Sequence, residues 1–535
     1  MVFTLHRYIF REVFKVFVLA TVALTLIMSL CSILRPIQEY GVGPAQVLDL
    51  MVYFLPITLT FVLPVAALFA TTLVYGRLAC DNELDACRAS GIPMLPLVYP
   101  GLILAVMVAI ANLLLSFYVM PAFVHRAENS LKNDARQILF RNIQRKGYYV
   151  LPPDEKYRIY ADNADVSNNT LSGVVAVEVE NPGGIKKIIT AETAGITFTP
   201  HEKFNEVRIT AHNTNQIGPD EEGSIAFEWL SISAEFGSLM GDNIKFKKID
   251  EMKKIRANPA IFDPVDKLAR RVYTRLTTEL LAQQINETIA AKTNQSFRLH
   301  NDRMIVEFVA KNCSVRSDNQ LLLADDIVVI ERPLSGLQIP RILRANKAFL
   351  SLEGDELTPT LTLDIRNAKW QTEQGIENLL SRYIIRGLIL PKEVTDHFKT
   401  SDILDDITPE AVRSALSAGP SADLTKLQKE LNRKIIRTLA QIRAETHSRL
   451  VFGIGCVTLI MIGIALGIIF KDGHLLTAFA ASAIPALALI TIIIMGKHLT
   501  ENLGSQALSG INLMWTGLVV LSILALILYR RLLRH

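Results

Sequence analysis

The residues of this chain that could do chemistry are concentrated in one short charged segment, Gly76–Ile92. Residues 77–89 favour a helix that ends at Gly91, because glycine and a following proline commonly stop helices. The predicted helix has an acidic side and a small apolar side that includes Leu84; the acidic side chains are Asp81, Glu83 and Asp85. Such a helix suits docking against a partner protein. The alternative is an interfacial helix that merely joins two membrane spans.

Motifs of enzymatic catalysis are missing from the sequence. It contains no phosphate-binding loop, zinc-protease helix, paired-cysteine motif or nucleophile elbow, and its ten histidines are scattered. The formal net charge of +4 gives no reason to expect nucleic acid as a partner. We therefore expect no catalytic residue, no metal site and no cofactor. Any directed work would have to be powered by a partner.

Cationic residues at the ends of apolar runs form a second group of candidates. Arg35 ends the first apolar run just before Pro36, and Lys497 and His498 end the fifth. A phosphorylated lipid headgroup needs cations near the membrane interface. We therefore take Arg35 and Lys497 as candidate lipid-binding residues; the alternative is that they are interfacial anchors.

Six apolar runs must position these residues. At about 1.5 Å per residue, each run is long enough to cross a hydrocarbon core of about 30 Å. Glycines in the fourth run, such as Gly463 and Gly467, predict close helix packing. The runs are Phe14–Leu34, Val52–Tyr75, Pro96–Pro121, Leu450–Phe470, Leu475–Gly496 and Ile511–Tyr529.

Basic residues flank both ends of this 3 + 3 arrangement. Arg7 and Arg11 precede the first run, and Arg530 and Arg531 follow the last. The positive-inside rule therefore predicts that both termini are cytoplasmic and that the long middle segment is extracytoplasmic. The predicted domains are an N-terminal transmembrane half at 1–124, an outer domain at 125–445 and a C-terminal transmembrane half at 446–535.

The middle segment is predicted to be β-rich, with helical interruptions. Gly173–Glu180 alternates with a period of two, and further short strands include Met304–Val309 and Ala348–Leu352. This spacing is typical of a sandwich, a jelly roll or an open barrel. Asp263 and Pro264 are predicted to begin a helix that runs to about residue 291, and a second helix leads into the fourth apolar run. The predicted fold class is an α-helical membrane protein with an inserted β-rich domain and helical insertions.

Three motifs resemble the LptF/LptG permease family, the membrane subunits of the lipopolysaccharide-export ABC transporter. They are Arg7-Tyr8-Ile9-x-Arg11-Glu12-Val13, Gly76-Arg77-Leu78 and Glu83-Leu-x-Ala86-x-Arg88-Ala-Ser-Gly91-Ile. The resemblance is strongest over residues 1–150 and continues to about residue 235. It resumes at Glu445–Arg449 and covers the last three apolar runs.

The resemblance implies a pair of such permease subunits in the inner membrane, above a dimer of a separate cytosolic ATPase. Segment 77–90 would be the coupling helix, with Glu83 as its main acidic contact, Arg88 orienting it, and Asp81 and Leu84 beside them. The first and fifth spans would line a lateral gate for lipopolysaccharide. The outer domain would be an open β-jelly roll that carries acyl chains to a jelly-roll protein bridging the periplasm.

The outer segment is longer than the resemblance requires. Residues from about 250 to 300, a β-rich stretch to 370 and a predicted helical stretch over 376–445 have no assigned counterpart. They could form a second domain, an insertion in the jelly roll or a docking surface. Three readings of the whole chain stay open: a permease for lipopolysaccharide or a related lipid, a membrane-anchored periplasmic scaffold, and a mechanotransmitting ABC subunit without lipid passage.

Overall fold

The computed structural model forms two compact units, Met1–Lys253 with Ala440–His535, and Lys254–Leu439. The described residues are 2–40, 44–133, 135–151, 157–180, 184–200, 205–217, 225–236, 242–290, 296–316, 319–334, 340–353, 360–371, 377–397, 403–470, 475–503 and 507–534.

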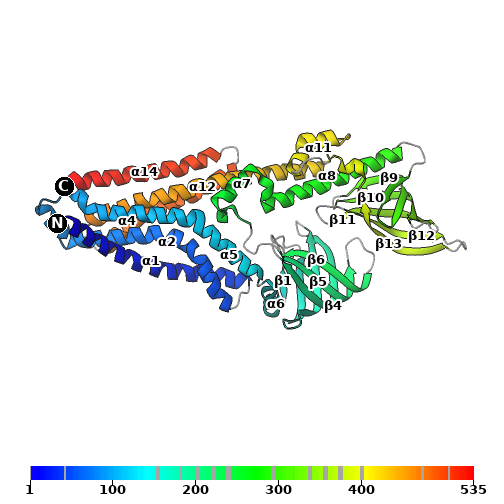
Figure 1. Ribbon diagram of the computed structural model, residues 1–535, viewed down its shortest axis with the longest axis horizontal. Coiled ribbons are helices and arrows are strands. Elements are labelled where there is room, and N and C mark those ends of the chain that lie inside the picture. The colour runs from blue at the N-terminus through cyan, green and yellow to red at the C-terminus, as the bar shows by residue number, and fades with distance from the viewer. Residues whose placement is uncertain are drawn as a thin grey trace. The chain divides into compact units, whose positions relative to one another are not determined.

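Long apolar helices form a bundle in the first unit. Six helical stretches in the described residues are long and apolar enough to cross a membrane, which confirms the six predicted runs. Figure 1 shows both termini at the same end of this bundle. The helices are α1 (Val2–Tyr40), α2 (Pro44–Cys80), α4 (Met94–Leu114), α5 (Met120–Asn133), α12 (Ala422–Ile469), α13 (Leu475–Leu503) and α14 (Ala507–Arg534), and the π-helix η1 (Leu115–Val119) joins α4 to α5.

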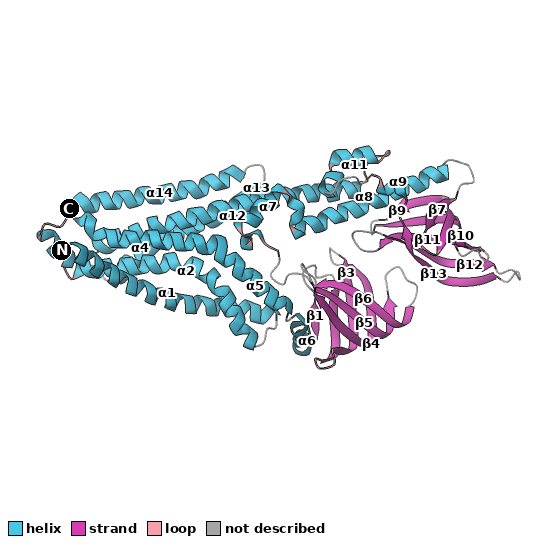
Figure 2. Cartoon of the chain, viewed as in Figure 1, coloured by secondary structure: helices cyan, strands magenta, loops and turns pink. Residues whose placement is uncertain are grey.

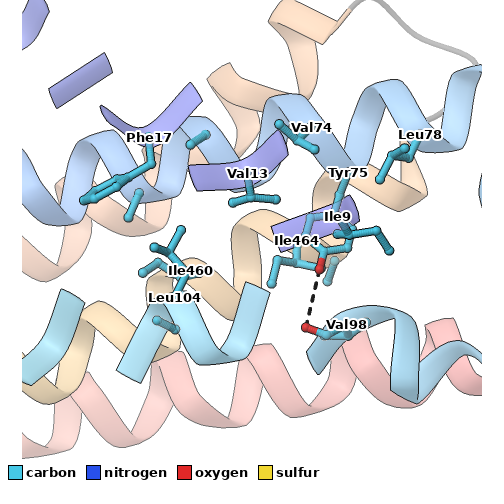
Figure 3. Packing of buried hydrophobic residues seen from close by; sticks show 14 of the residues in the cluster. Ile9, Val13, Phe17, Val74, Tyr75, Leu78, Val98, Leu104, Ile460 and Ile464 are labelled. Atoms are coloured by element: carbon cyan, nitrogen blue, oxygen red, sulfur yellow. Dashed lines mark hydrogen bonds between the residues drawn. The ribbon is translucent and has the colours of Figure 1, made fainter. Parts of the chain in front are cut away.

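The core of the bundle joins helices from both halves of the chain. Figure 3 shows Ile9, Tyr75 and Ile464 together in this core, contributed by α1, α2 and α12. The buried hydroxyl of Tyr75 donates to the carbonyl of Leu97 at 3.0 Å, which satisfies a polar group that has no access to water. A Cβ at Gly467 would lie 2.7 Å from the carbonyl oxygen of Thr72, so this glycine permits close packing, as predicted.

A six-stranded antiparallel sheet belongs to the same unit, and strands adjacent in sequence are adjacent in the sheet (Figure 2). Helix α6 (Ala135–Lys146) packs Leu139 and Phe140 into one cluster with Ile159 and Ile209 of the sheet. The predicted strand over 173–180 is confirmed. The strands are β1 (Tyr148–Val150), β2 (Tyr157–Asp165), β3 (Thr170–Glu180), β4 (Gly184–Pro200), β5 (Asn205–Ile217) and β6 (Ile225–Phe236).

The second unit contains another antiparallel sheet and helix α8 (Asp263–Ala290). The helix begins at the predicted Asp263–Pro264, and Val265, Val272 and Leu276 of its apolar face are buried, as the 3.6-residue period predicted. The strands are β7 (Phe297–His300), β8 (Met304–Val309), β9 (Asn312–Val315), β10 (Gln320–Pro333), β11 (Arg341–Glu353), β12 (Thr360–Gln371) and β13 (Glu377–Ile389).

The sheet order in this unit is β13-β12-β11-β10-β8-β7, and β9 also pairs with β10. Short helices complete the described secondary structure: α7 (Ile249–Ala257), α9 (Lys392–Thr395), α10 (Ile403–Asp406), α11 (Pro409–Ala415), η2 (Ile244–Phe246) and η3 (Pro259–Ile261).

The helical prediction for residues 376–445 is wrong at its start, because β13 occupies Glu377–Ile389. This strand pairs with β12 over most of its length, from Glu377 opposite Gln371 to Ile389 opposite Thr360. It also carries Tyr383 and three isoleucines, which pack well on a sheet. Pairing within the fold outweighs the helix-forming residues. The structure nevertheless confirms the predicted class, an α-helical membrane protein with a β-rich part and additional helices.

Candidate functional site

The charged segment between α2 and α4 forms a short helix, α3 (Glu83–Ala89). Asn82 has a left-handed φ of 57°, which interrupts the helical conformation between α2 and α3. The helix predicted over residues 77–90 is therefore in two parts, since residues 77–80 are the last turn of α2. Leu84 of α3 is buried in the same cluster as Ile9 of α1 and Leu532 of α14, so α3 lies at the end of the bundle that holds both termini.

The end of α3 is the glycine stop that the sequence predicted. Gly91 has a φ of +84°, a conformation that residues with a side chain rarely adopt. The Ile92 amide donates to the carbonyl of Cys87 at 3.2 Å, and the Gly91 amide donates to Arg88 at 2.9 Å. These two bonds make a Schellman motif, which gives α3 a defined end.

The charges of α3 and the preceding turn are exposed and loosely paired. Asp81 and Glu83 are both exposed. The Tyr8 hydroxyl donates to a carboxylate oxygen of Glu83 at 3.5 Å, and Arg88 lies 3.8 Å from Asp85 one turn away. Exposed pairs of this kind add little to stability. Leu84 anchors α3 to the bundle, while the charged side chains of α3 face outward.

Two further features surround α3. The Arg77 guanidinium lies 3.3 Å from Glu12, so an ion pair joins the end of α2 to α1 and links two of the sequence motifs. A cavity of about 280 Å³ lies beside α3, and α12 and α14 complete its walls with apolar and cationic side chains. Its lining includes Leu84, Arg88, Met94, Ile468, Arg531 and Leu532.

A second cavity, of about 260 Å³, lies between α2, η1, α12 and α13; we call it the ionic pocket. Most of its wall is apolar and includes Phe61, Phe452, Ile490 and Ile494. The same cavity also contacts four charged side chains, which we call the Glu445 cluster: Glu445, Arg449, Lys497 and Lys245. The ionic pocket therefore combines an apolar wall with a group of charges.

The Glu445 cluster is tightly bonded. One carboxylate oxygen of Glu445 accepts from Arg449 at 3.0 Å, and the other accepts from the Lys497 ammonium group. Arg449 also donates to the carbonyl of Lys245 at 2.7 Å. Buried charges require such partners, because an unpaired charge in an apolar surrounding is very costly. Arg449 and Lys497 share one carboxylate, and Lys245 lines the same cavity, so the cluster carries an excess of positive charge.

The π-helix η1 supplies one side of the ionic pocket. Ser116 lines the cavity, and the Phe117 ring lies 5.5 Å from the Arg449 guanidinium, within the range of a cation–π contact. π-Helical turns are uncommon and often occur at functional sites. Here the turn brings a polar and an aromatic side chain next to the cations.

Lys245 has an altered titration because of its surroundings. Burial lowers its pKa from the usual 10.5. The Glu445 carboxylate opposes that shift, while Lys497 and Arg449 add to it. The lysine therefore loses its proton more easily than an exposed lysine does.

Comparison with protein families decides the identity of the chain. A sequence profile of the lipopolysaccharide export system permease LptF/LptG matches residues 7–252 and 265–531. The chain belongs to the LptF/LptG family. Members are permease subunits of an inner-membrane ABC transporter for lipopolysaccharide, and they are not themselves enzymes. Among curated proteins, no significant match was found.

The LptF/LptG match also covers the part of the chain that the sequence motifs left unassigned. It runs without a break from residue 265 to residue 531, and so includes α8 except for its first two residues, and the whole second sheet. The three sequence motifs lie outside these residues, in α1, in α2 and in and just after α3, so they could not reveal this part of the match.

Of the two predicted lipid-binding residues, only Lys497 has a described side chain. Lys497 lies in the ionic pocket, bonded to Glu445. Arg35 belongs to α1, but its side chain lies outside the described residues. His498 is exposed and pairs with Asn502 at 2.9 Å, away from the cluster.

Sequence reasoning missed Glu445, Arg449 and Lys245 as members of a site. Two of them carried a readable signal, since Glu445 and Arg449 are spaced i, i+4 at the start of an apolar run. Charges in such a position are expensive and commonly functional. Lys245 carried none, because its contact with Arg449 joins residues 204 positions apart.

Proposed function

We propose that this chain extracts lipopolysaccharide, or a related lipid, from the inner membrane through the ionic pocket. The observation that carries the proposal is the pairing of an apolar wall with the Glu445 cluster in one cavity. Acyl chains would pack against Phe61, Phe452 and Ile494. The headgroup phosphate would bind the excess cations, because charge-assisted hydrogen bonds to phosphate are among the strongest in proteins.

Within the Glu445 cluster, we propose different roles for the individual residues. Arg449 bonds both to Glu445 and to a backbone carbonyl, so we propose that it holds the site together. Lys497 and Lys245 would bind the incoming phosphate, since a lysine ammonium reorients easily on its flexible stem. We propose that Arg35, at the end of the first run, adds a further cation at the gate.

Energy would come from a separate cytosolic ATPase dimer that docks on α3. Exposed Asp81 and Glu83 would contact the ATPase, and Arg88 would hold the acidic side in place through Asp85. Leu84 would transmit the motion, because it is buried in the core shared by α1, α2, α4, α12 and α14. A second LptF/LptG-type subunit would complete the membrane channel.

The proposed topology places α3 and both termini in the cytoplasm. Support comes from the basic residues near both termini and from their position at one end of the bundle. The membrane halves would be 1–124 and 446–535, with 125–445 in the periplasm. There, the covered face of the first sheet would receive acyl chains and pass them to a bridging jelly-roll protein.

A photocrosslinking experiment in cells tests the route. A photoreactive residue at Ile494 reports on the ionic pocket, and one at Leu230 of β6 reports on the sheet face that carries Ala211. Met495 is the matched control on α13, since it is 64% exposed against 63% for Ile494 and does not line the pocket. Trp229 is the control on the opposite face of β6.

Lipopolysaccharide adducts are expected at Ile494 and Leu230 and should be much weaker at Met495 and Trp229. In the Glu83→Arg variant, adducts at Leu230 should disappear while those at Ile494 persist, because capture precedes the powered step. A folded, inserted protein with adducts at neither position would overturn lipid passage and favour the scaffold or the mechanotransmitting subunit.

A further inference from the structure

The second sheet, in the unit Lys254–Leu439, carries cationic side chains directly opposite one another on neighbouring strands. Arg344 of β11 lies opposite Lys369 of β12, and Lys347 lies opposite Arg366. Arg366 in turn lies opposite Arg382 of β13. Like charges in such positions destabilise an antiparallel pair. We call these residues the cationic rows, and they reduce the stability of the fold.

The cationic rows share the face of the sheet that is turned away from its core. Along β11, Leu343, Ala345 and Ala348 are buried, whereas Arg344 and Lys347 are exposed. Two successive residues turn outward in this stretch, since Lys347 follows the exposed Asn346. The irregularity therefore brings more polar side chains to the outer face than a regular strand would.

The strands on either side of β11, which are β10 and β12, are also irregular near Arg344 and Lys347. On β10 the register shifts between Ala324 and Ile327, and Asp326 there has a φ of 49°. On β12, Asn367 has a φ of 52° and follows Arg366. Bulges and left-handed residues are frequently placed where a protein re-aims side chains toward a ligand.

A cavity of about 470 Å³ opens between these irregular strands. Its lining includes Arg344 and Lys369, with the amide side chains of Asn346 and Asn367 beside them. Ammonium, guanidinium and amide groups are hydrogen-bond donors, and phosphate oxygens are their strongest acceptors. The one carboxylate in the lining, Asp326, is already bonded to Lys311.

Acidic residues on this face compensate only part of the charge. The Asp364 carboxylate accepts two hydrogen bonds from Arg382, at 3.0 and 2.9 Å, and lies 3.8 Å from Arg366. Among the described residues, Arg344 and Lys347 form no ion pair. The end of the face around Arg344 therefore keeps the largest excess of positive charge.

We propose that the cationic rows bind the phosphate groups of the exported lipid's headgroup; this inference rests on the proposed function. The two rows are three residues apart, roughly 10 Å along the strands, so they suit a headgroup that carries more than one phosphate. Arginine and lysine in such density favour phosphate over a protein partner, because tight protein interfaces are built around buried apolar anchors. The unfavourable like-charge pairs would be relieved when the phosphates bind.

The test uses the full chain in detergent and a headgroup probe without acyl chains. The probe is fully deacylated lipopolysaccharide, which keeps its phosphates, compared with the same probe after dephosphorylation. Binding is measured by calorimetry for wild type and for the double variant Arg344→Gln with Lys369→Gln. The matched control is Lys429→Gln with Arg433→Gln, which removes the same charges from an exposed stretch of α12.

The Arg344→Gln, Lys369→Gln variant should bind the phosphorylated probe at least about tenfold more weakly, as expected for lost bonds to a charged ligand. The α12 control should stay within about twofold of wild type, and the dephosphorylated probe should bind to none of them. The sheet variant should also melt no lower than wild type, because opposed charges have been removed. Equal binding by the two double variants would overturn the proposal.

Two further outcomes separate this inference from the proposed function. Crosslinking of intact lipopolysaccharide at Ile494 should persist in the sheet variant, because capture in the ionic pocket does not use the second sheet. If wild type forms no lipopolysaccharide adducts at Ile494 but still binds the deacylated headgroup probe, the proposed function alone would be overturned. Wild-type binding to anionic phospholipid vesicles but not to the probe would make this face a membrane-binding one and overturn the inference.

Discussion

The two charged regions of the helix bundle are built in opposite ways. The side chains of Asp85 and Arg88 on α3 are 47% and 39% exposed and lie 3.8 Å apart. Glu445 and Arg449 in the ionic pocket are 9% and 3% exposed and bond at 3.0 Å. Exposed ion pairs add little to folding, whereas breaking a buried pair leaves an unpaired charge and is costly. We therefore propose different roles for the same residue types: partner docking where they are exposed, and ligand binding where they are buried.

The largest expected effect is that of Glu445→Ala. It leaves Arg449 buried without its carboxylate, which should lower the free energy of unfolding by about 3–5 kcal/mol. Thermal unfolding of the purified protein in detergent measures this loss. Glu83→Ala is the control and should change stability by less than about 0.5 kcal/mol, because its side chain is exposed. Equal melting temperatures for Glu445→Ala and Glu83→Ala would contradict the difference in stability expected between the two charged regions.

Removing one pocket cation should affect ligand binding more than folding. Lys497→Ala should reduce lipopolysaccharide crosslinking at Ile494 about tenfold, because one charged bond to the phosphate is lost. Lys497→Arg keeps the charge and should retain most of the signal. Arg88→Ala, on α3, should leave this capture step unchanged. A Lys497→Ala variant that captures lipid normally would exclude this residue from the site.

The end of α3 allows a smaller and more local test. Gly91→Ala should cost about 1–2 kcal/mol, because an alanine in the left-handed region is strained. The cost is one of the backbone alone, since a Cβ there would meet no atom within 4 Å. Faster hydrogen exchange of the Gly91 and Ile92 amides would report the loosened helix end. Gly184→Ala, equally open and with an ordinary φ, should have little effect.

The smallest expected effect is a pH dependence from Lys245. Its pKa is lower in the folded protein than in the unfolded chain, so between that pKa and the usual 10.5 the unfolded chain binds more protons. Stability should therefore rise slightly with pH over this interval. Anion binding should weaken over the same interval, because the lysine loses its charge. A Lys245→Arg variant should show neither change, and a wild type as insensitive as that variant would contradict the prediction.

Sequence reasoning found the α3 region more completely than the ionic pocket. Glu83, Leu84 and Gly91 are neighbours in sequence, so helix pattern and capping rules were sufficient to recognise them. The Glu445 cluster collects residues from η2, α12 and α13, and only Lys497 was recognised, from its place at the end of an apolar run. A set of contacts between distant segments has no local spacing that could reveal it.

The same distinction explains the successes and errors in the fold. The six spans and α8 follow from local hydrophobic patterns and were predicted. The break at Asn82 was missed, because the helix-favouring residues on both sides of it hide a single left-handed position. Strand β13 was also missed, because its pairing with β12 outweighs the helix-forming residues of the segment.

The π-helix η1 has a consequence for how this permease can change. A π-turn holds one more residue than an α-turn, so deleting a single residue within Leu115–Val119 would restore regular winding. Side chains beyond the deletion would keep nearly their present direction relative to α4, because a π-turn rotates the helix by about as much as an α-helical stretch that is one residue shorter. Met120, which lines the ionic pocket, would therefore stay on the same side of its helix. The change would fall on η1 itself, where Ser116 lines the pocket and Phe117 contacts Arg449, so a single deletion would reshape this wall without altering any charge.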